Sequence, residues 1–122
     1  MSHRTVRINE LVQRELSDIL RRHYQSEAVA MTITEVRVAP DLRDGRVFVS
    51  IVGTDDQIED RLRWIKRQAP AMREELGRRI VLKYLPKFEY LLDRSAVRSV
   101  KLNLLLDQLD QADRDRESPK DA

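Results

Sequence analysis

Two segments of alternating apolar and polar residues, joined by a short turn, most constrain the fold of this chain. Alternation runs along residues 31–39 and again along residues 46–52, which is the pattern of half-buried strands. The turn between them, residues 40–45, ends in Gly45, a residue that can take a positive φ. The two strands are therefore predicted to form a hairpin.

Helical periodicity precedes and follows this hairpin. Residues 4–24 are predicted to form a helix, because their apolar residues gather on one face at about 100° per residue. The apolar face consists of Ile8, Val12, Leu16, Ile19 and Leu20. After the hairpin, Thr54 or Asp55 can cap a helix that runs to about Gln68.

Pro70 is predicted to break or bend this second helical region. Proline lacks an N–H and restricts the residue before it, so a new helix is expected to start there and to end near Leu85. The free N–H groups of that new N-terminus could attract an anion, or the break could be a bare corner with no ligand.

A third alternating segment follows Pro86, which stops the helix before it. Phe88, Tyr90 and Leu92 are spaced as one face of a strand, and the polar residues 93–95 close it with a turn. The predicted strand therefore has one face on the core.

A last helix is predicted over residues 97–109, where several leucines share a face. The polar residues 111–122 are expected to be a disordered tail, which leaves residues 1–110 as a single domain. The predicted order of elements is α-β-β-α-α-β-α.

Composition limits the compartment and the chemistry. The 122-residue chain has no cysteine, which excludes disulfides and thiolate metal sites and indicates a reducing compartment. No run approaches the roughly 18 apolar residues of a membrane span, and the N-terminus lacks the apolar core of a signal peptide. A cytoplasmic location is predicted.

Positive charge is concentrated in one part of the chain. The net charge is only +2, yet residues 61–83 contain eight basic and two acidic residues, and the acidic residues near the C-terminus offset them. A basic helix pair is typical of a surface that binds nucleic-acid phosphates. Arginines also recur along the first helix, where the simpler interpretation is a solvated face with i, i+4 ion pairs.

These features resemble the ribosome-binding factor A family of bacterial small-subunit maturation factors. Matching blocks occur in order over residues 4–106: the basic first helix, MTITEVRV, RVFVS, AMREELG and the segment 86–95. The resemblance implies an α+β fold, a type II KH-like domain with a three-stranded mixed sheet covered by helices, in the order α-β-β-α-(kink)-α-β-α. At the interhelical kink, Gln68, Ala69 and Pro70 replace the family's Ala-x-Gly. A close approach of phosphate to the backbone that depends on the family's glycine is therefore not transferred to this chain.

The resemblance also implies a function. The family binds the free 30S small ribosomal subunit and its 16S rRNA during late maturation and rRNA processing, without catalysis, and a ribosome-dependent GTPase releases it. In this chain, basic residues of the hairpin turn and helix pair are the candidates to clamp sugar–phosphate, with shape rather than base edges giving selectivity. The candidate RNA-binding residues are Arg43, Arg46, Lys66, Arg67, Arg73, Arg78, Arg79 and Lys83.

Other functions have less support in the sequence. It contains no Gly-rich phosphate loop, metal-ligand spacing or nucleophile elbow, and a strand-ending turn explains Asp93 and Ser95. No cofactor, metal or catalytic residue is predicted. Trp64 and Tyr84 are interpreted as partly buried core residues rather than as platforms for base stacking.

A protein–protein adaptor or dimerisation domain is the alternative function. The leucines of the predicted last helix are more numerous than one helix face needs, and exposed ones would mark a partner surface. If they instead seal the domain, the protein is a monomer, as we expect.

Overall fold

The computed structural model describes residues 3–95 of the chain. The helices are α1 (His3–His23), α2 (Gln25–Ala28) and α3 (Asp55–Arg79), and the strands are β1 (Met31–Val38), β2 (Asp44–Ile51) and β3 (Lys87–Leu92). The predicted last helix over 97–109 and the predicted tail over 111–122 lie outside the described residues. The short helix α2 has no counterpart in the sequence prediction.

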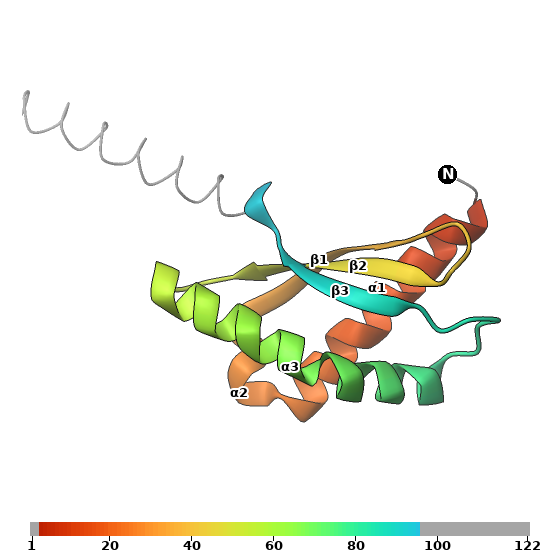
Figure 1. Cartoon of the computed structure of the whole chain (residues 1–122). Helices are drawn as coiled ribbons and strands as arrows, with labels where there is room; N and C mark the ends of the chain where they lie inside the picture. Colours follow the sequence, from red (N-terminus) through yellow and green to blue (C-terminus); the bar gives the residue numbers. More distant parts are fainter. Residues whose placement is uncertain (1–2, 96–122) are drawn as a thin grey trace, which may run out of the picture.

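The three strands form one mixed sheet in the order β1-β2-β3. Strand β1 pairs antiparallel with β2, and β2 pairs parallel with β3. A parallel pair needs a crossover connection, which α3 provides. Figure 1 shows α1 and α3 on the same side of the sheet, with α1 packed on β1 and α3 on β3. The predicted α+β fold with a three-stranded mixed sheet is thus confirmed.

Aliphatic side chains fill the space between this sheet and the two long helices. All five residues predicted for the apolar face of α1 are buried, as are Val47 and Val49 at the centre of the sheet. From α3, Ile65, Met72 and Leu76 are fully buried. The hydrophobic pattern therefore identified the faces that form the core.

A β-bulge in β1 links α1 to the far end of β3. The register of β1 on β2 shifts between Ile33 and Glu35, which leaves Thr34 as the extra residue. The Thr34 hydroxyl donates to an Asp93 carboxylate oxygen at 2.6 Å, and Gln13 of α1 donates to the Thr34 carbonyl at 3.1 Å. Asp93 also accepts from the backbone N–H of Ser95 at 3.0 Å, directly after the end of β3. Arg94 and Ser95 are helical, so the polar turn predicted over 93–95 is wrong.

Helix α3 is one continuous helix of 25 residues, so the prediction that a new helix starts at Pro70 is wrong. In Figure 1 the axis of α3 changes direction near its middle, so the helix bends without ending. The apolar spacing explains this continuity, because Ile65, Met72 and Leu76 follow one another at seven and four residues and share a face across the proline. Burying that face outweighs the one hydrogen bond that proline removes. The expected second helix N-terminus, with its free N–H groups, does not exist.

The start of α3 is as predicted, but its end is not. Thr54 caps its start as predicted, in a capping box with Gln57. The helix ends at Arg79 rather than near Leu85, because Ile80 is extended and places its side chain in the core. Residues 80–86 form a loop that leads into β3.

The hairpin turn takes its positive φ at Leu42 (φ 61°) and not at Gly45, the residue that the sequence offered for it. The left-handed conformation of a non-glycine residue costs about 1–2 kcal/mol. Here it directs the Leu42 side chain into the core, where it is only 5% exposed. The next residue, Arg43, is exposed.

Gly45 has a different role, as the site of close contact between β2 and β3. It pairs with Phe88, and a Cβ at Gly45 would lie 2.8 Å from two atoms of the Phe88 ring. A side chain at this position would therefore displace the ring.

We predict that Gly45→Ala lowers the free energy of unfolding by about 1–3 kcal/mol, the usual cost of overpacking. Urea denaturation measures this change. In a Phe88→Leu background the cost of Gly45→Ala should be smaller, because the ring that clashes is gone. An equal cost in both backgrounds would contradict the proposed contact.

Candidate nucleic-acid interface

A basic cleft lies where the hairpin turn, the loop 80–86 and the start of β3 meet. Its volume is about 600 Å³, and we call it the Tyr84 cleft. It is lined by Arg43, Asp44, Arg73, Lys83, Tyr84, Leu85 and Lys87. Four of these residues are cationic and one is acidic, so the cleft carries a net positive charge.

Arg73 of α3 holds the loop that forms one wall of this cleft. Its guanidinium donates to the backbone carbonyls of Leu85 at 2.7 Å and Pro86 at 2.9 Å. Charge-assisted hydrogen bonds of this kind are among the stronger ones in proteins. On the other side, the backbone N–H of Lys87 donates to the Arg43 carbonyl at 2.9 Å. The loop and the hairpin turn are therefore both fastened to the start of β3.

The ring of Tyr84 is flanked by two cations in the cleft. The guanidinium carbon of Arg43 lies 5.3 Å from the ring centroid, and Nζ of Lys83 lies 5.6 Å from it. Cation–π contacts at exposed sites contribute about 0.5–1 kcal/mol each. Tyr84 is 42% exposed, so its interpretation as a partly buried core residue is wrong.

A second basic hollow adjoins the cleft at Lys83, which lines both. This hollow, the α1 hollow, has a volume of about 420 Å³. It is lined by His3, Arg4, Arg7, Ile8, Val81, Leu82 and Lys83. Figure 1 shows the start of α1, the hairpin turn and the α3–β3 loop at the same end of the molecule. The two hollows therefore form one cationic end.

The exposed cations of this end have no carboxylate partner in the part of the chain that the structure describes. Within residues 3–95, none of the ion pairs involves Arg4, Arg7, Arg43, Lys83 or Lys87. Their charge is available to an incoming anion without breaking an existing pair.

Two predicted RNA-binding residues, Arg78 and Arg79, are already engaged by carboxylates. Arg78 pairs with Glu74 at 2.9 Å and Glu75 at 2.8 Å. Arg79 joins α3 to α1, since it pairs with Asp18 at 2.6 Å and with Glu15 at 3.4 Å. These contacts argue against a role for either arginine in holding phosphate.

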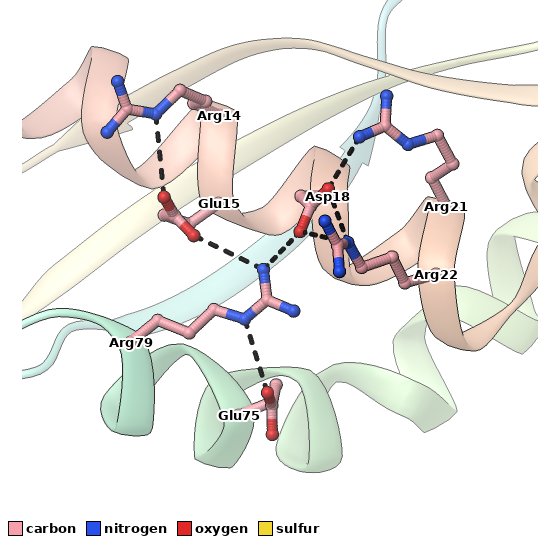
Figure 2. A network of polar contacts seen from close by, with 7 residues as sticks. All are labelled: Arg14, Glu15, Asp18, Arg21, Arg22, Glu75 and Arg79. Atoms are coloured by element: carbon pink, nitrogen blue, oxygen red, sulfur yellow. Dashed lines mark hydrogen bonds and ion pairs between the residues drawn. The ribbon is translucent and has the colours of Figure 1, made fainter.

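Figure 2 shows Arg79 at the centre of this network, between carboxylates of both helices. Asp18 accepts hydrogen bonds from Arg79, and from Arg21 and Arg22 on its own helix. These bonds lower the pKa of Asp18 well below its usual range, and the bond from Arg79 has the largest effect. Asp18 in turn is the main reason that the pKa of Arg79 is raised. The network is thus a charged joint between α1 and α3.

The other predicted residues lie apart from the cleft. Arg46 is on the sheet face turned away from the helices, next to Arg37 and Glu89 in the strand register. Lys66 and Arg67 are exposed on α3, and neither lines the cleft. Their neighbours at the predicted kink, including Pro70, lie within the continuous helix.

The structure therefore brings together three of the predicted residues, Arg43, Arg73 and Lys83, and adds two that the sequence reasoning missed. Lys87 lies directly after Pro86, at the first position of β3. Its position next to the proline that was predicted to stop the preceding helix was the available signal. Tyr84 was weighed and assigned to the core. Trp64, by contrast, packs on the core and edge-on against Tyr24, as predicted.

The described residues offer no site for metal chemistry. Across residues 3–95, no group of three or more His, Cys, Asp or Glu side chains is placed to hold a metal ion. The same part of the chain has no helix long and apolar enough to cross a membrane.

The fold and this cationic end define a small α+β domain of the KH-like class with a positively charged surface. The family model described as "Ribosome-binding factor A" matches residues 4–106. The chain belongs to this family.

Curated relatives of the same name support the assignment. The protein from Opitutus terrae is 62% identical over 111 residues, which cover 91% of each chain. The protein from Acetivibrio thermocellus is 32% identical over 120 residues, covering 97% of this chain and 98% of that one.

Solved structures share the fold at lower identity. The crystal structure of ribosome-binding factor A from Thermus thermophilus aligns with a TM-score of 0.66 and 22% identity, covering 74% of this chain and 97% of that one. A homology model of the T. thermophilus factor, fitted into a cryo-EM map of a 30S–RbfA complex, aligns with a TM-score of 0.59 and 21% identity. It covers 78% of this chain and 97% of that model.

The charged joint between α1 and α3 gives a pH-dependent prediction. Asp18→Asn should lower the free energy of unfolding at pH 7, because the native carboxylate is stabilised by three arginines. Since the folded pKa is depressed, this stabilisation is complete above about pH 4 and is lost as the pH falls further. Urea denaturation across a pH series should show the two proteins converging at acid pH.

Asp60→Asn is the matched control. Asp60 is an exposed carboxylate of α3 that pairs only with the exposed Arg63, so its replacement should change stability little. An Asp18→Asn effect that is equally small, or that persists unchanged at acid pH, would contradict the assigned role of the joint.

Proposed function

We propose that this protein is a non-catalytic assembly factor that binds the free 30S small ribosomal subunit through its 16S rRNA during late maturation and rRNA processing. Its place of action is the cytoplasm, it acts as a monomer, and a ribosome-dependent GTPase releases it. Membership of the ribosome-binding factor A family supports this proposal. So does the T. thermophilus factor, which was fitted into a map of a 30S–RbfA complex.

The observation that carries the proposal is the gathering, at one end of the domain, of cations that have no ion-pair partner among residues 3–95. Arg43, Lys83 and Lys87 surround the Tyr84 cleft, and Arg4 and Arg7 extend the positive surface into the α1 hollow. When cations without carboxylate partners contact a nucleic-acid backbone, they release its counterions, and this release favours binding. On α3, Arg63, Arg78 and Arg79 are paired with acidic side chains, whereas Lys66 and Arg67 are exposed, are in none of the ion pairs of residues 3–95 and lie apart from the cleft.

The geometry of this end favours recognition of shape over sequence. Its cations come from α1, the hairpin turn, the loop 80–86 and β3, so they are spread over a surface rather than aligned on one helix. Such an arrangement suits the irregular backbone of folded rRNA, where phosphate contacts fix position and orientation. The RNA-binding set that we propose is therefore Arg4, Arg7, Arg43, Lys83 and Lys87, with Arg73 holding the loop. It replaces the set predicted from the sequence.

A salt titration tests this surface. Replacing Lys83 and Lys87 together by alanine should weaken binding to free small subunits and lower the slope of log K against log salt by about 1.4–1.8, since each phosphate contact contributes roughly 0.7–0.9. The two lysines are exposed, so the fold should be unaffected.

The control for charge is the double variant Arg63→Ala with Arg78→Ala. It removes the same number of cations from α3, but both of these arginines are already paired. It should leave the slope nearly unchanged. Equal effects of the two double variants would show that only net charge matters and would remove the cleft from the interface.

The class of function is tested by gradient sedimentation of a cell lysate. We expect the protein to migrate with free small subunits and to be absent from translating ribosomes. Gel filtration of the purified protein should give a concentration-independent monomer. A dimer that does not bind small subunits would instead support the adaptor function.

A further inference from the structure

Tyr84 is an exposed aromatic ring in a cleft that is otherwise built for anions. Phosphate contacts explain the cations of this cleft, but they give no reason for a ring to stand between them. The ring is held by the loop that Arg73 fastens, and it is flanked by Arg43 and Lys83. Aromatic rings beside cations are the usual platform for unpaired bases in proteins that bind single-stranded nucleic acid.

We propose that the Tyr84 cleft takes one unstacked nucleotide of a single-stranded RNA segment, with its base on the Tyr84 ring and its flanking phosphates on Arg43, Lys83 and Lys87. This inference rests on the proposed function and specifies the form of the RNA. It predicts that the protein prefers single-stranded RNA to duplex RNA. Phosphate binding alone does not give this preference, because a duplex carries the same phosphates but keeps its bases stacked.

The dimensions and lining of the cleft fit a nucleotide. Its volume of about 600 Å³ lies within the range of small-ligand sites, roughly 300–1,000 Å³. Leu85 adds apolar surface beside the ring. Asp44 is the one carboxylate among the lining residues, and a carboxylate only accepts hydrogen bonds. It therefore suits the N–H groups of a base or a ribose hydroxyl, and not a phosphate.

The cleft is also held in shape before any ligand arrives. Arg73 binds both carbonyls at the end of the loop, and the Lys87 N–H binds the Arg43 carbonyl. The buried side chain of Leu42 anchors the hairpin turn next to Arg43. A site that is already ordered loses less entropy on binding. The cations now beside the ring are long and exposed, so they can swing to phosphates while the ring stays in place.

Binding of labelled RNA, followed by fluorescence anisotropy, tests the proposal. The probes are a short single-stranded RNA, the same strand annealed to its complement, and a free nucleoside monophosphate. The native protein should prefer the single strand to the duplex at equal salt. Tyr84→Leu should weaken single-strand binding roughly five- to a hundredfold, the range expected for one stacked base, and should leave duplex binding and the salt slope unchanged.

Tyr84→Trp is the conservative variant and should keep the preference, because it retains an aromatic face. Val29→Ala is the control for loss of an exposed apolar side chain, since Val29 is 89% exposed and does not line the cleft. It should have no effect. Thermal unfolding of each variant checks that the fold is intact.

The outcomes separate this inference from the proposed function. If Tyr84→Leu leaves single-strand affinity unchanged while the Lys83 and Lys87 double variant weakens both RNA forms, the nucleotide site is overturned and the phosphate surface stands. If neither variant changes RNA binding, both proposals fail. Equal affinity for the free nucleoside monophosphate and the RNA strand would also overturn the inference, because the site would then serve a small nucleotide.

Discussion

The two hydrogen bonds from Arg73 to the carbonyls of Leu85 and Pro86 hold the arrangement on which the candidate surface depends. Helix α3 ends at Arg79, and the chain must then turn back to start β3 parallel to β2. The intervening loop has no regular structure of its own. Arg73 ties it to the helix, and the pairing of β3 with β2 brings it against the hairpin turn. The cleft exists because these two connections converge.

Two groups among the arginines and lysines of this domain do different work. Those facing the joint between α1 and α3, above all Arg79, are neutralised by carboxylates and stabilise the packing of the two helices. Those at the end formed by the hairpin turn, the loop and the start of α1 have no such partners in the described part of the chain. A net charge of only +2 conceals this division. Local pairing, more than total charge, decides where a polyanion can bind.

Much of the fold could be predicted from the sequence because hydrophobic periodicity reports directly on burial. It identified α1 with its buried face and the positions of all three strands. It failed at Pro70, where a local rule about proline was preferred to an apolar spacing that continues through it, and at Leu42, whose backbone is set by the burial of its own side chain. The site was harder to predict. Arg79 meets Asp18 across 61 residues of sequence, so no local pattern separates it from an unpaired arginine such as Arg43.

We propose the cationic end around Tyr84 as the face that meets rRNA. Ultraviolet cross-linking of the protein bound to free small subunits, followed by mass spectrometry of the RNA-attached peptides, tests it most directly. The attached nucleotides should map to residues 80–87 and to the hairpin turn at Arg43. Cross-links confined to the exposed faces of α3 at Lys66 and Arg67, or to the joint at Arg21 and Arg22, would contradict it.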